Sequence, residues 1–300
     1  MMNSYRSIYV RTPCACAMPG FSALVKREQF EHAAQAQGAL AKRRKPQVTG
    51  LGKYVARKSP ALARKLKKAL ASAAKRYAKR VAALYADRLA KDAGPKPDVI
   101  AQMLAELNSD DLGQTLSGEL TPAMLAAFKR AAQVGVSQVG LDMTDDITDQ
   151  VDEAAVAFAK QRGGELIKDL AGTTDDALRS LLERAVEEGM SADELSDAVM
   201  NMGAFGEARA DMIARTELAF AHVAGNKQGW SESGQVVGKR SLLGDLHDVA
   251  DICDDAADAG VVGIDQPFVD GADDPPYHPL CVCDLEPVLS EDTSDSESDA

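Results

Sequence analysis

Apolar side chains recur at every third or fourth position over much of the chain, the spacing that gathers them on one face of an α-helix. The clearest stripe begins after Pro60 and consists of Leu62, Leu66, Leu70, Ala73, Tyr77, Val81, Leu84 and Leu89. The other faces of this segment are rich in lysine and arginine. The pattern therefore predicts an amphipathic helix over residues 60–92 with a basic outer surface.

Proline, glycine and capping residues divide the next part of the chain into shorter predicted helices. Residues 94–97 predict a linker, and residues 98–107 predict a short helix after it. Thr121 followed by Pro122 is typical of an N-cap and a first helical position, and predicts a helix that ends near Val139. We expect these helices to be antiparallel neighbours in a bundle because their connections are short.

Two glycines and a capping motif set the predicted bounds of the following helices. Gly172 predicts a break, and Gly189 predicts the end of a helix over residues 175–188. Ser191-x-x-Glu194 has the spacing of a capping box, in which each side chain binds the backbone N–H of the other residue. A further helix is therefore expected to start at this point.

A helix over residues 207–228 carries several small side chains, which would let another element approach closely. Arg215 and Glu217 are two positions apart, so they do not face each other on this helix. We expect both to form ion pairs with the Cys/His-containing region downstream. His222 lies on the same helix and is assigned no role.

Short strands are predicted near the C-terminal end, at residues 235–243 and 261–265, and residues 282–288 are expected to pair with one of them. From Ser290 onward the chain is polar and acidic, which predicts a disordered tail. The sequence thus predicts a mainly α fold. Its parts are a helical body, a small α+β C-terminal module, a basic N-terminal arm and a disordered acidic tail.

Composition narrows the class of protein. Only 5% of the 300 residues are aromatic and 45% are hydrophobic, which favours helix packed on helix over a sheet sandwich. No apolar run approaches the ~18 residues of a membrane-spanning helix, and the first thirty residues lack the apolar segment of a secretory signal. Because no segment is long and apolar enough to span a membrane, we expect no membrane partner. Five cysteines, which cannot all pair, favour a reducing compartment.

The net charge of −12 conceals an unequal distribution. Residues 1–91 carry 21 of the 34 lysine and arginine residues but only three of the 46 acidic residues. Residues 1–59 are expected to form a flexible basic arm. The basic run at residues 42–45 and the basic face of the helix after it are either solvated or in contact with DNA or an acidic protein surface.

Cysteine and histidine gather in the last quarter of the chain, where apolar runs are short. The candidate metal ligands are Cys253, His278, Cys281 and Cys283. Thiolate and imidazole are the ligands that zinc prefers in tetrahedral geometry, so we expect a metal to stabilise this module. His247 is an alternative to one of the four ligands. In the opposite interpretation, the cysteines are small buried hydrophobic residues.

Several motifs follow one another in this half of the chain. The first is the segment Ala214-Arg215-Thr216-Glu217, followed by Ala219, Ala221, Gly225, Asn226 and Trp230. A turn at Cys253, a Gly-Val-Val-containing segment at residues 260–268 and a Pro/His/Cys-rich segment at residues 275–283 come after it. Together they resemble the phage Mu protein F-like minor head proteins over roughly residues 173–288. The chain departs from that family at Ala256, where many relatives have a second cysteine, and at Val282, where arginine is frequent.

The pattern predicts a helical region at residues 60–172 and a tail at residues 290–300, and the resemblance implies a Mu F-like head morphogenesis domain at residues 173–289. It also implies a phage minor capsid protein that binds the portal protein and other head components. Such a protein is found in the virion head and, during assembly, in the host cytoplasm. Its work is expected to be binding rather than catalysis, with DNA contacted through the basic arm. Zinc would be structural because four protein ligands close its site.

Two other functions remain open. A hydrolase-type enzyme would hold zinc with three cysteines and use Glu217 or Asp255 as a general base. A nucleic-acid-binding protein would use residues 42–91, and its affinity would depend steeply on salt concentration.

Overall fold

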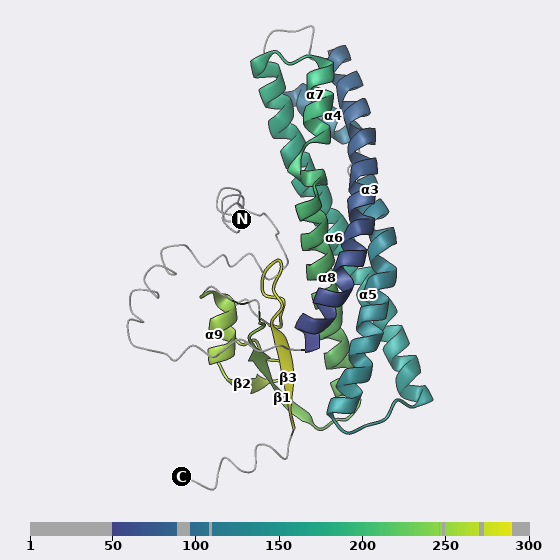
Figure 1. Ribbon diagram of the computed structural model, residues 1–300, viewed down its shortest axis with the longest axis vertical. Helices are drawn as coiled ribbons and strands as arrows, with labels where there is room; N and C mark the ends of the chain where they lie inside the picture. Colours follow the sequence, from purple (N-terminus) through teal and green to yellow (C-terminus); the bar gives the residue numbers. More distant parts are fainter. Residues whose placement is uncertain are drawn as a thin grey trace, which may run out of the picture. The chain divides into compact units, whose positions relative to one another are not determined.

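The computed structural model describes residues 50–88, 97–107, 110–245, 247, 250–269 and 273–289. These residues form seven α-helices, one 3-10 helix and three strands (Figure 1). The described part of the chain is mainly helical, with a small antiparallel sheet toward its C-terminal end, as the sequence predicts. The predicted arm up to residue 49 and the acidic tail from residue 290 lie outside the described residues.

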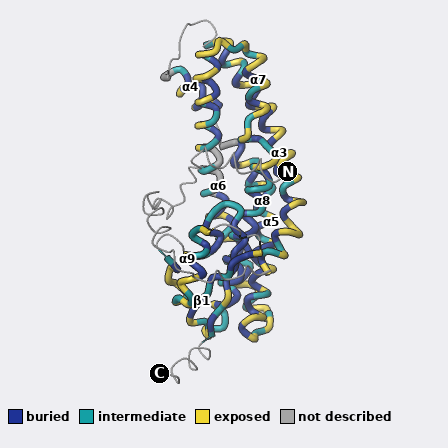
Figure 2. Tube along the Cα trace, turned by 60° about the vertical axis from the view of Figure 1, so that its left-hand side comes forward, coloured by how far each residue is buried: buried dark blue, intermediate teal, exposed yellow. Residues whose placement is uncertain are grey.

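The helical body is built from helices whose buried faces share one apolar core. Its elements are α3 Gly50–Arg88, α4 Pro97–Leu107, α5 Asp110–Gln138, α6 Asp145–Glu188, α7 Ala192–Met200, the 3-10 helix Gly203–Phe205 and α8 Glu207–Ser231. Buried and exposed positions alternate along these helices in Figure 2, as expected for amphipathic segments. α8 is the central element for the rest of the description, because it packs against α3, α5, α6 and β3.

α3 begins earlier than predicted, at Gly50 instead of Pro60. Leu51 and Val55 extend its buried stripe, and Pro60 lies inside the helix. An internal proline costs roughly 3 kcal/mol, whereas burying an apolar side chain contributes about 1.5–3 kcal/mol. Packing of the two residues therefore offsets the local break. Residues 50–59 are helical and are not part of a flexible arm.

The predicted start of α5 is wrong for the same reason. The helix begins at Asp110, so Thr121 is not its N-cap and Pro122 lies in its interior. The turns before the proline are held in the core by Leu112, Leu116 and Leu120. Here too, tertiary burial decides the outcome against a local helix-breaking residue.

The predicted break at Gly172 is also wrong, because α6 runs through it without interruption. A glycine inside a helix costs only about 1 kcal/mol relative to alanine. The next turn is fixed from outside, since the guanidinium of Arg209 on α8 donates hydrogen bonds to the hydroxyls of Thr173 and Thr174. The expected domain boundary between residues 172 and 173 therefore falls inside a helix.

Helix-end signals that depend only on local chemistry are confirmed. Gly189 ends α6 in the left-handed conformation with a φ of 67°. Ser191 and Glu194 form the predicted capping box at the start of α7, with distances of 3.2 Å from Glu194 N to Ser191 Oγ and 2.8 Å from Ser191 N to Glu194 Oε2.

Glycines allow α5 and α8 to approach each other closely. A Cβ atom at Gly225 would lie 2.2 Å from a backbone oxygen of α5, and one at Gly229 would lie 2.3 Å from another. A Cβ atom at Gly135 of α5 would in turn lie 2.4 Å from a backbone oxygen of α8. No side chain fits at these distances, so the expectation that small residues on this helix admit a close neighbour is confirmed.

The C-terminal module is a three-stranded antiparallel sheet with one short helix. β1 Val236–Leu242 lies in the centre, between β2 Val261–Gly263 and β3 Asp284–Leu289. The prediction that residues 282–288 pair with an earlier strand is confirmed, because β3 pairs with β1. α9 Ile252–Asp258 packs on β1. Buried residues of the module belong to the same apolar cluster as those of the helices.

Candidate metal centre

Cys253 is positioned by the capped start of α9. Asp251 is the N-cap residue, and its carboxylate accepts a hydrogen bond from the backbone N–H of Cys253 at 2.8 Å. Asp254 completes a capping box by accepting from the backbone N–H of Asp251 at 3.0 Å. Cys253 is fully buried in the first turn of the helix.

A tight turn places His278 and Cys281 opposite this helix. The carbonyl oxygen of His278 accepts from the N–H of Cys281 at 3.1 Å, and Leu280 between them has a positive φ of 65°. The N–H of Leu280 donates to the Thr216 hydroxyl of α8 at 3.1 Å. The turn that carries two candidate ligands is therefore anchored to the helical body. Cys283 follows immediately before β3.

A partly buried charge cluster holds the loop that leads into this turn. Asp274 accepts from the ammonium groups of Lys227 on α8 and Lys239 on β1, each at 2.7 Å. Lys239 is buried, and also donates to the carbonyl oxygen of Asp273 at 2.9 Å. Tyr277 donates to the hydroxyl of Ser241 at 3.0 Å. This cluster could not be predicted from the sequence, because a lysine in a strand is normally exposed.

The structure brings the candidate ligands together around Cys253. Its Sγ atom lies 3.2 Å from Nε2 of His278 and 3.7 Å from Sγ of Cys281. The ligand atoms of these three residues all lie within 4.8 Å of one another. A tetrahedral zinc with bonds of about 2.3 Å to sulfur separates two sulfur atoms by about 3.8 Å. The distance between the Sγ atoms of Cys253 and Cys281 therefore matches that of two sulfur ligands on one zinc ion.

Cys283 and His247 join the same cluster through Cys253. The three residues form a second group whose ligand atoms lie within 4.8 Å of one another. Nε2 of His247 also lies 2.8 Å from Oδ2 of Asp254. Both histidines considered from the sequence thus lie beside the thiols. Each of the two groups offers a metal ion two cysteines and one imidazole, and Cys253 belongs to both.

The orientation of His278 suits a ligand that coordinates through Nε2. Its Nδ1 atom lies 2.8 Å from the carbonyl oxygen of Pro279, which only accepts hydrogen bonds, so Nδ1 carries a proton. In the neutral ring, Nε2 then turns its lone pair toward Cys253. A backbone carbonyl that fixes the tautomer in this way is typical of metal-binding histidines.

The thiols compete for one negative charge. Hydrogen bonds from Cys253 and Cys283 lower the pKa of Cys281 well below its usual value, whereas the hydrogen bond to Cys281 raises the pKa of Cys253. Cys253 lowers the pKa of Cys283, but Cys281 and burial outweigh this and raise it to about 12. Burial lowers the pKa of His278, and the thiolate of Cys281 more than reverses this, to about 9. A bound cation would stabilise several thiolates at once, which is the condition for metal binding.

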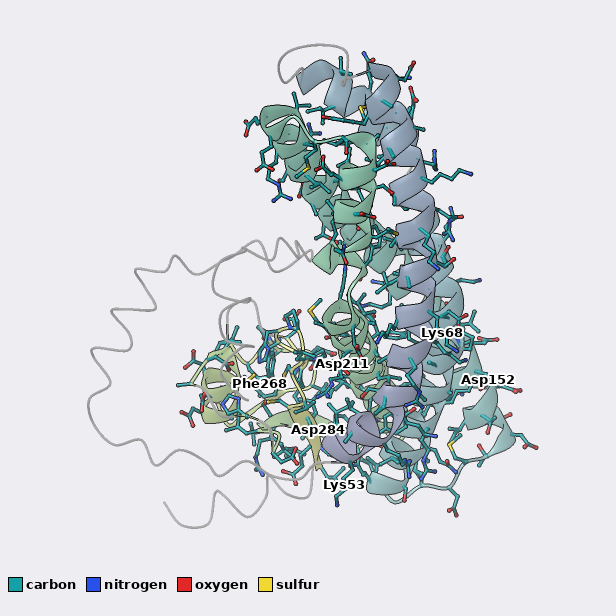
Figure 3. The ribbon with its side chains drawn as sticks, turned by 45° about the horizontal axis from the view of Figure 1, so that its top comes forward. Lys53, Lys68, Asp152, Asp211, Phe268 and Asp284 are labelled. Atoms are coloured by element: carbon teal, nitrogen blue, oxygen red, sulfur yellow. The ribbon has the colours of Figure 1, made fainter. Side chains whose placement is uncertain are left out.

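Arg215 and Glu217 do not contact the Cys/His cluster, so the predicted ion pairs are wrong. The guanidinium of Arg162 on α6 donates two hydrogen bonds of 2.8 Å to the carboxylate of Glu217. Nε of Arg215 lies 2.9 Å from Oδ2 of Asp211, one turn earlier on the same helix; Figure 3 labels Asp211. Thr216, between the two, makes the contact with the C-terminal module.

The two residues proposed as a general base in an enzyme are placed differently. Glu217 is buried in its pair with Arg162, although burial raises its pKa. Asp255 is exposed on α9, where partial burial and the neighbouring carboxylates raise its pKa. Neither residue belongs to a group of potential metal ligands among the described residues.

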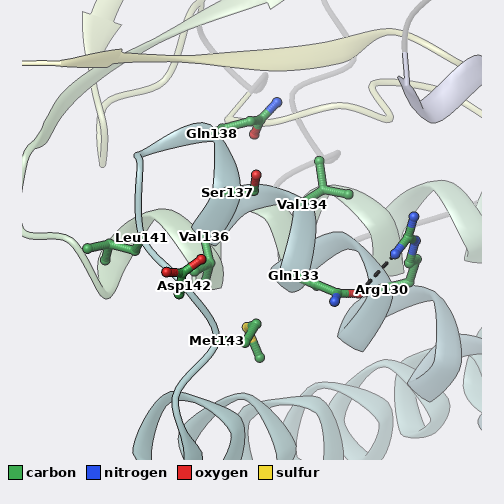
Figure 4. Close-up of a pocket in the computed structure, with 9 residues that line it drawn as sticks. All are labelled: Arg130, Gln133, Val134, Val136, Ser137, Gln138, Leu141, Asp142 and Met143. Atoms are coloured by element: carbon green, nitrogen blue, oxygen red, sulfur yellow. Dashed lines mark hydrogen bonds between the residues drawn. The ribbon is translucent and has the colours of Figure 1, made fainter.

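Two pockets lie among the described residues. The larger, of about 540 Å³, lies at the C-terminal end of α5 (Figure 4). Its two charged residues, Arg130 and Asp142, are exposed, and Arg130 donates to Gln133 at 2.9 Å. The second, of about 340 Å³, is lined by residues of α3, α5 and α8 and by Asp284. No cysteine lines either pocket.

Comparison of the chain with models of known protein families, with curated proteins and with solved structures found no match. Among the described residues, no helix is both long and apolar enough to cross a membrane.

Proposed function

We propose that this chain is a phage minor capsid protein of the Mu protein F-like type, which acts in head morphogenesis by binding the portal protein and other head components. One observation supports the proposal most: the separated motifs that carry the resemblance meet at one place. Thr216 of the first motif binds the backbone of Leu280 in the last, and Cys253 of the second lies against Cys281.

Other residues of these motifs have structural roles in the same region. Gly225 admits the close approach of α5, and Trp230 donates to Gln138 of α5 at 2.8 Å. Phe268 packs edge-on against Tyr277, with ring centroids 6.4 Å apart. Motif residues that build a fold, without lining a pocket beside the thiols, support a protein that works by binding.

The proposed metal is a structural zinc held by Cys253, His278, Cys281 and Cys283. The departure at Ala256 leaves this set intact, because the four ligands come from α9, the turn and the residue before β3. When bound, zinc would neutralise the thiolates and join the start of α9 to the turn. A site closed by four protein ligands leaves no coordination position for a substrate. The alternative, a hydrolase-type zinc enzyme, needs such an open position.

Metal content tests the site directly. Wild-type protein purified without added chelator is expected to carry about one zinc per chain. Cys281→Ser should lose it, whereas Cys16→Ser, outside the described residues, should retain it. Comparing His278→Asn with His247→Asn identifies the fourth ligand, and only the first is expected to lose zinc. Wild-type protein without bound metal would contradict the zinc proposal.

Association with the portal protein tests the function. Full-length protein carrying an affinity tag should co-purify with a portal protein and other head components from phage-producing cells. The same experiment with Cys281→Ser shows whether the folded C-terminal module is needed. Failure of the wild-type chain to associate with any head component would contradict the head morphogenesis proposal, whatever its zinc content.

A further inference from the structure

The smaller pocket combines unpaired cations with buried polar atoms that have no partner. It lies where α3, α5 and α8 meet the start of β3, and has a volume of about 340 Å³. This is at the lower end of the range for small-ligand sites. None of the proposed metal ligands lines it.

Two buried side chains of α8 form its floor. His222 is 5% exposed and Asn226 is 2% exposed, and their four-residue spacing places both on one helix face. Nδ1 of His222 and Oδ1 of Asn226 have no hydrogen-bond partner in the described part of the chain. An unsatisfied buried polar atom costs about 1–3 kcal/mol, so almost all such atoms in proteins have a partner. The missing partner would have to occupy the pocket.

Three basic residues form the rim. Lys53 and Arg57 are one turn apart on α3, and Arg130 approaches from α5. All three are exposed, and within the described residues none forms an ion pair. This cluster of like charge would be relieved by an anion, and a guanidinium fork matches the geometry of a phosphoryl group.

The one acidic residue in the pocket is already engaged. Oδ2 of Asp284 accepts from the backbone N–H of Leu51 at 3.0 Å, and Oδ1 accepts from that of Leu285 at 2.9 Å. Figure 3 labels Lys53 in the first turns of α3 and Asp284 at the start of β3. Asp284 therefore fixes the wall of the pocket and leaves an excess of positive charge at the rim.

We propose that this pocket binds a small phosphorylated polyol, such as a sugar phosphate. The phosphoryl group lies between Lys53, Arg57 and Arg130 at the rim. Hydroxyl groups of the polyol donate to Oδ1 of Asn226 and to Nδ1 of His222 on the floor. The phosphoryl group thus meets three cations that form no ion pair among the described residues, and the hydroxyl groups meet two buried atoms without a hydrogen-bond partner there. The proposal is independent of the zinc site and of the head morphogenesis proposal.

Calorimetric titration of the full-length protein with ribose 5-phosphate, inorganic phosphate and ribose, at one ionic strength, tests both parts of the ligand. Ribose 5-phosphate should bind about tenfold or more tightly than either fragment. Arg57→Gln combined with Arg130→Gln should weaken its binding by about tenfold or more, because both charges are removed from the rim. Arg64→Gln, an exposed position two turns further along α3, is the matched control and should leave the affinity unchanged.

Nitrogen NMR of the imidazole rings tests the floor of the pocket. Ribose 5-phosphate should shift the Nδ1 resonance of His222 in the wild-type protein, and His222→Phe should weaken binding. The NMR shift still tests the floor if that variant does not fold. Equal affinities in the double variant and Arg64→Gln, or an unmoved Nδ1 resonance, would overturn the proposal. So would binding of duplex DNA with no binding of ribose 5-phosphate.

Discussion

At the scale of single residues, Thr216 of α8 holds the turn that carries His278 and Cys281, because its hydroxyl accepts a hydrogen bond from the N–H of Leu280. The spacing of its neighbours Arg215 and Glu217 correctly excludes a pair between them. Arg215 pairs one turn earlier on the same helix, whereas the partner of Glu217 comes from α6. Arg162 lies 55 residues away from Glu217 in sequence, and nothing local marks it as the partner. The gathering of cysteine and histidine side chains around Cys253 could be predicted, because thiolate and imidazole are the ligands that zinc prefers. The residues that orient them could not.

Replacing Thr216 with valine tests the anchor of the metal-binding turn. The change keeps the shape of the side chain but leaves the N–H of Leu280 without its acceptor, which should cost about 1–3 kcal/mol of unfolding free energy. Zinc affinity should fall as well, because the turn carries two ligands. Denaturant unfolding and zinc competition measure both effects. The control Arg215→Gln removes a half-exposed pair and should cost less than about 1 kcal/mol; equal losses would contradict the anchor.

His222 predicts a specific dependence of stability on pH. Burial lowers its pKa, and Asp284 only partly opposes this. The unfolded chain takes up a proton near pH ~6.5, while the folded protein does so only at lower pH. Its contribution to stability is therefore complete above pH ~6.5 and declines as the pH falls, by up to about 1.4 kcal/mol per pH unit.

Urea unfolding of the wild type and His222→Gln between pH 5 and 7.5 checks this. In the variant, the free energy of unfolding should fall less steeply toward acid pH than it does in the wild type. His32→Gln, at a histidine outside the described residues, should keep the wild-type steepness. Parallel curves for the wild type and His222→Gln would exclude the linkage.

At the scale of elements, local signals are reliable only where tertiary packing does not compete with them. The left-handed glycine at residue 189 and the capping box at Ser191 were predictable because neighbouring residues satisfy them. Pro60, Pro122 and Gly172 are local breakers that fail, because the helices around them bury apolar residues or bind other elements. Helix ends are thus better predicted from capping residues, which bind the free backbone groups, than from proline or glycine, which only weaken the helix.

The close contact of α5 with α8 gives a matched pair of glycine substitutions. Gly225→Ala would place its methyl group 2.2 Å from a backbone oxygen, so the helices must separate, at a cost of about 1–3 kcal/mol or more. Gly118→Ala lies in α5 with nothing within 4 Å, and should stabilise the protein by about 0.5–1 kcal/mol. Thermal unfolding of the two variants should shift in opposite directions. A shift in the same direction would contradict the tight interface.

At the scale of the whole molecule, the C-terminal module shares its core with the helices. Cys253, Cys281 and Cys283 belong to the same buried cluster as Trp230 and Phe128. The sequence suggested that this region was too poor in apolar residues to keep its shape without metal. Residues of the helical body complete the core of the module from outside it. This could not be predicted, because contacts between distant segments leave no pattern in the local sequence.

Removing metal should therefore loosen the module without unfolding the helices. With free zinc at about 1,000 times its dissociation constant, binding would add about 4 kcal/mol to stability, and a chelator should remove this amount. Hydrogen exchange should rise in β1, β3 and the turn at His278, and change least in α7. Cys281→Ser provides the control, since chelation should not affect it. Identical wild-type unfolding with and without chelator would contradict a stabilising metal.

The uninterrupted course of α6 has a practical consequence for anyone expressing parts of this protein. A gene fragment starting at codon 173 would encode only about the last third of α6, without the capped beginning of this helix at Thr144. It would also omit Arg162 and leave the carboxylate of Glu217 without its counter-charge in the interior. Such a product should accumulate in inclusion bodies, whereas one starting before Gly50 retains every described helix.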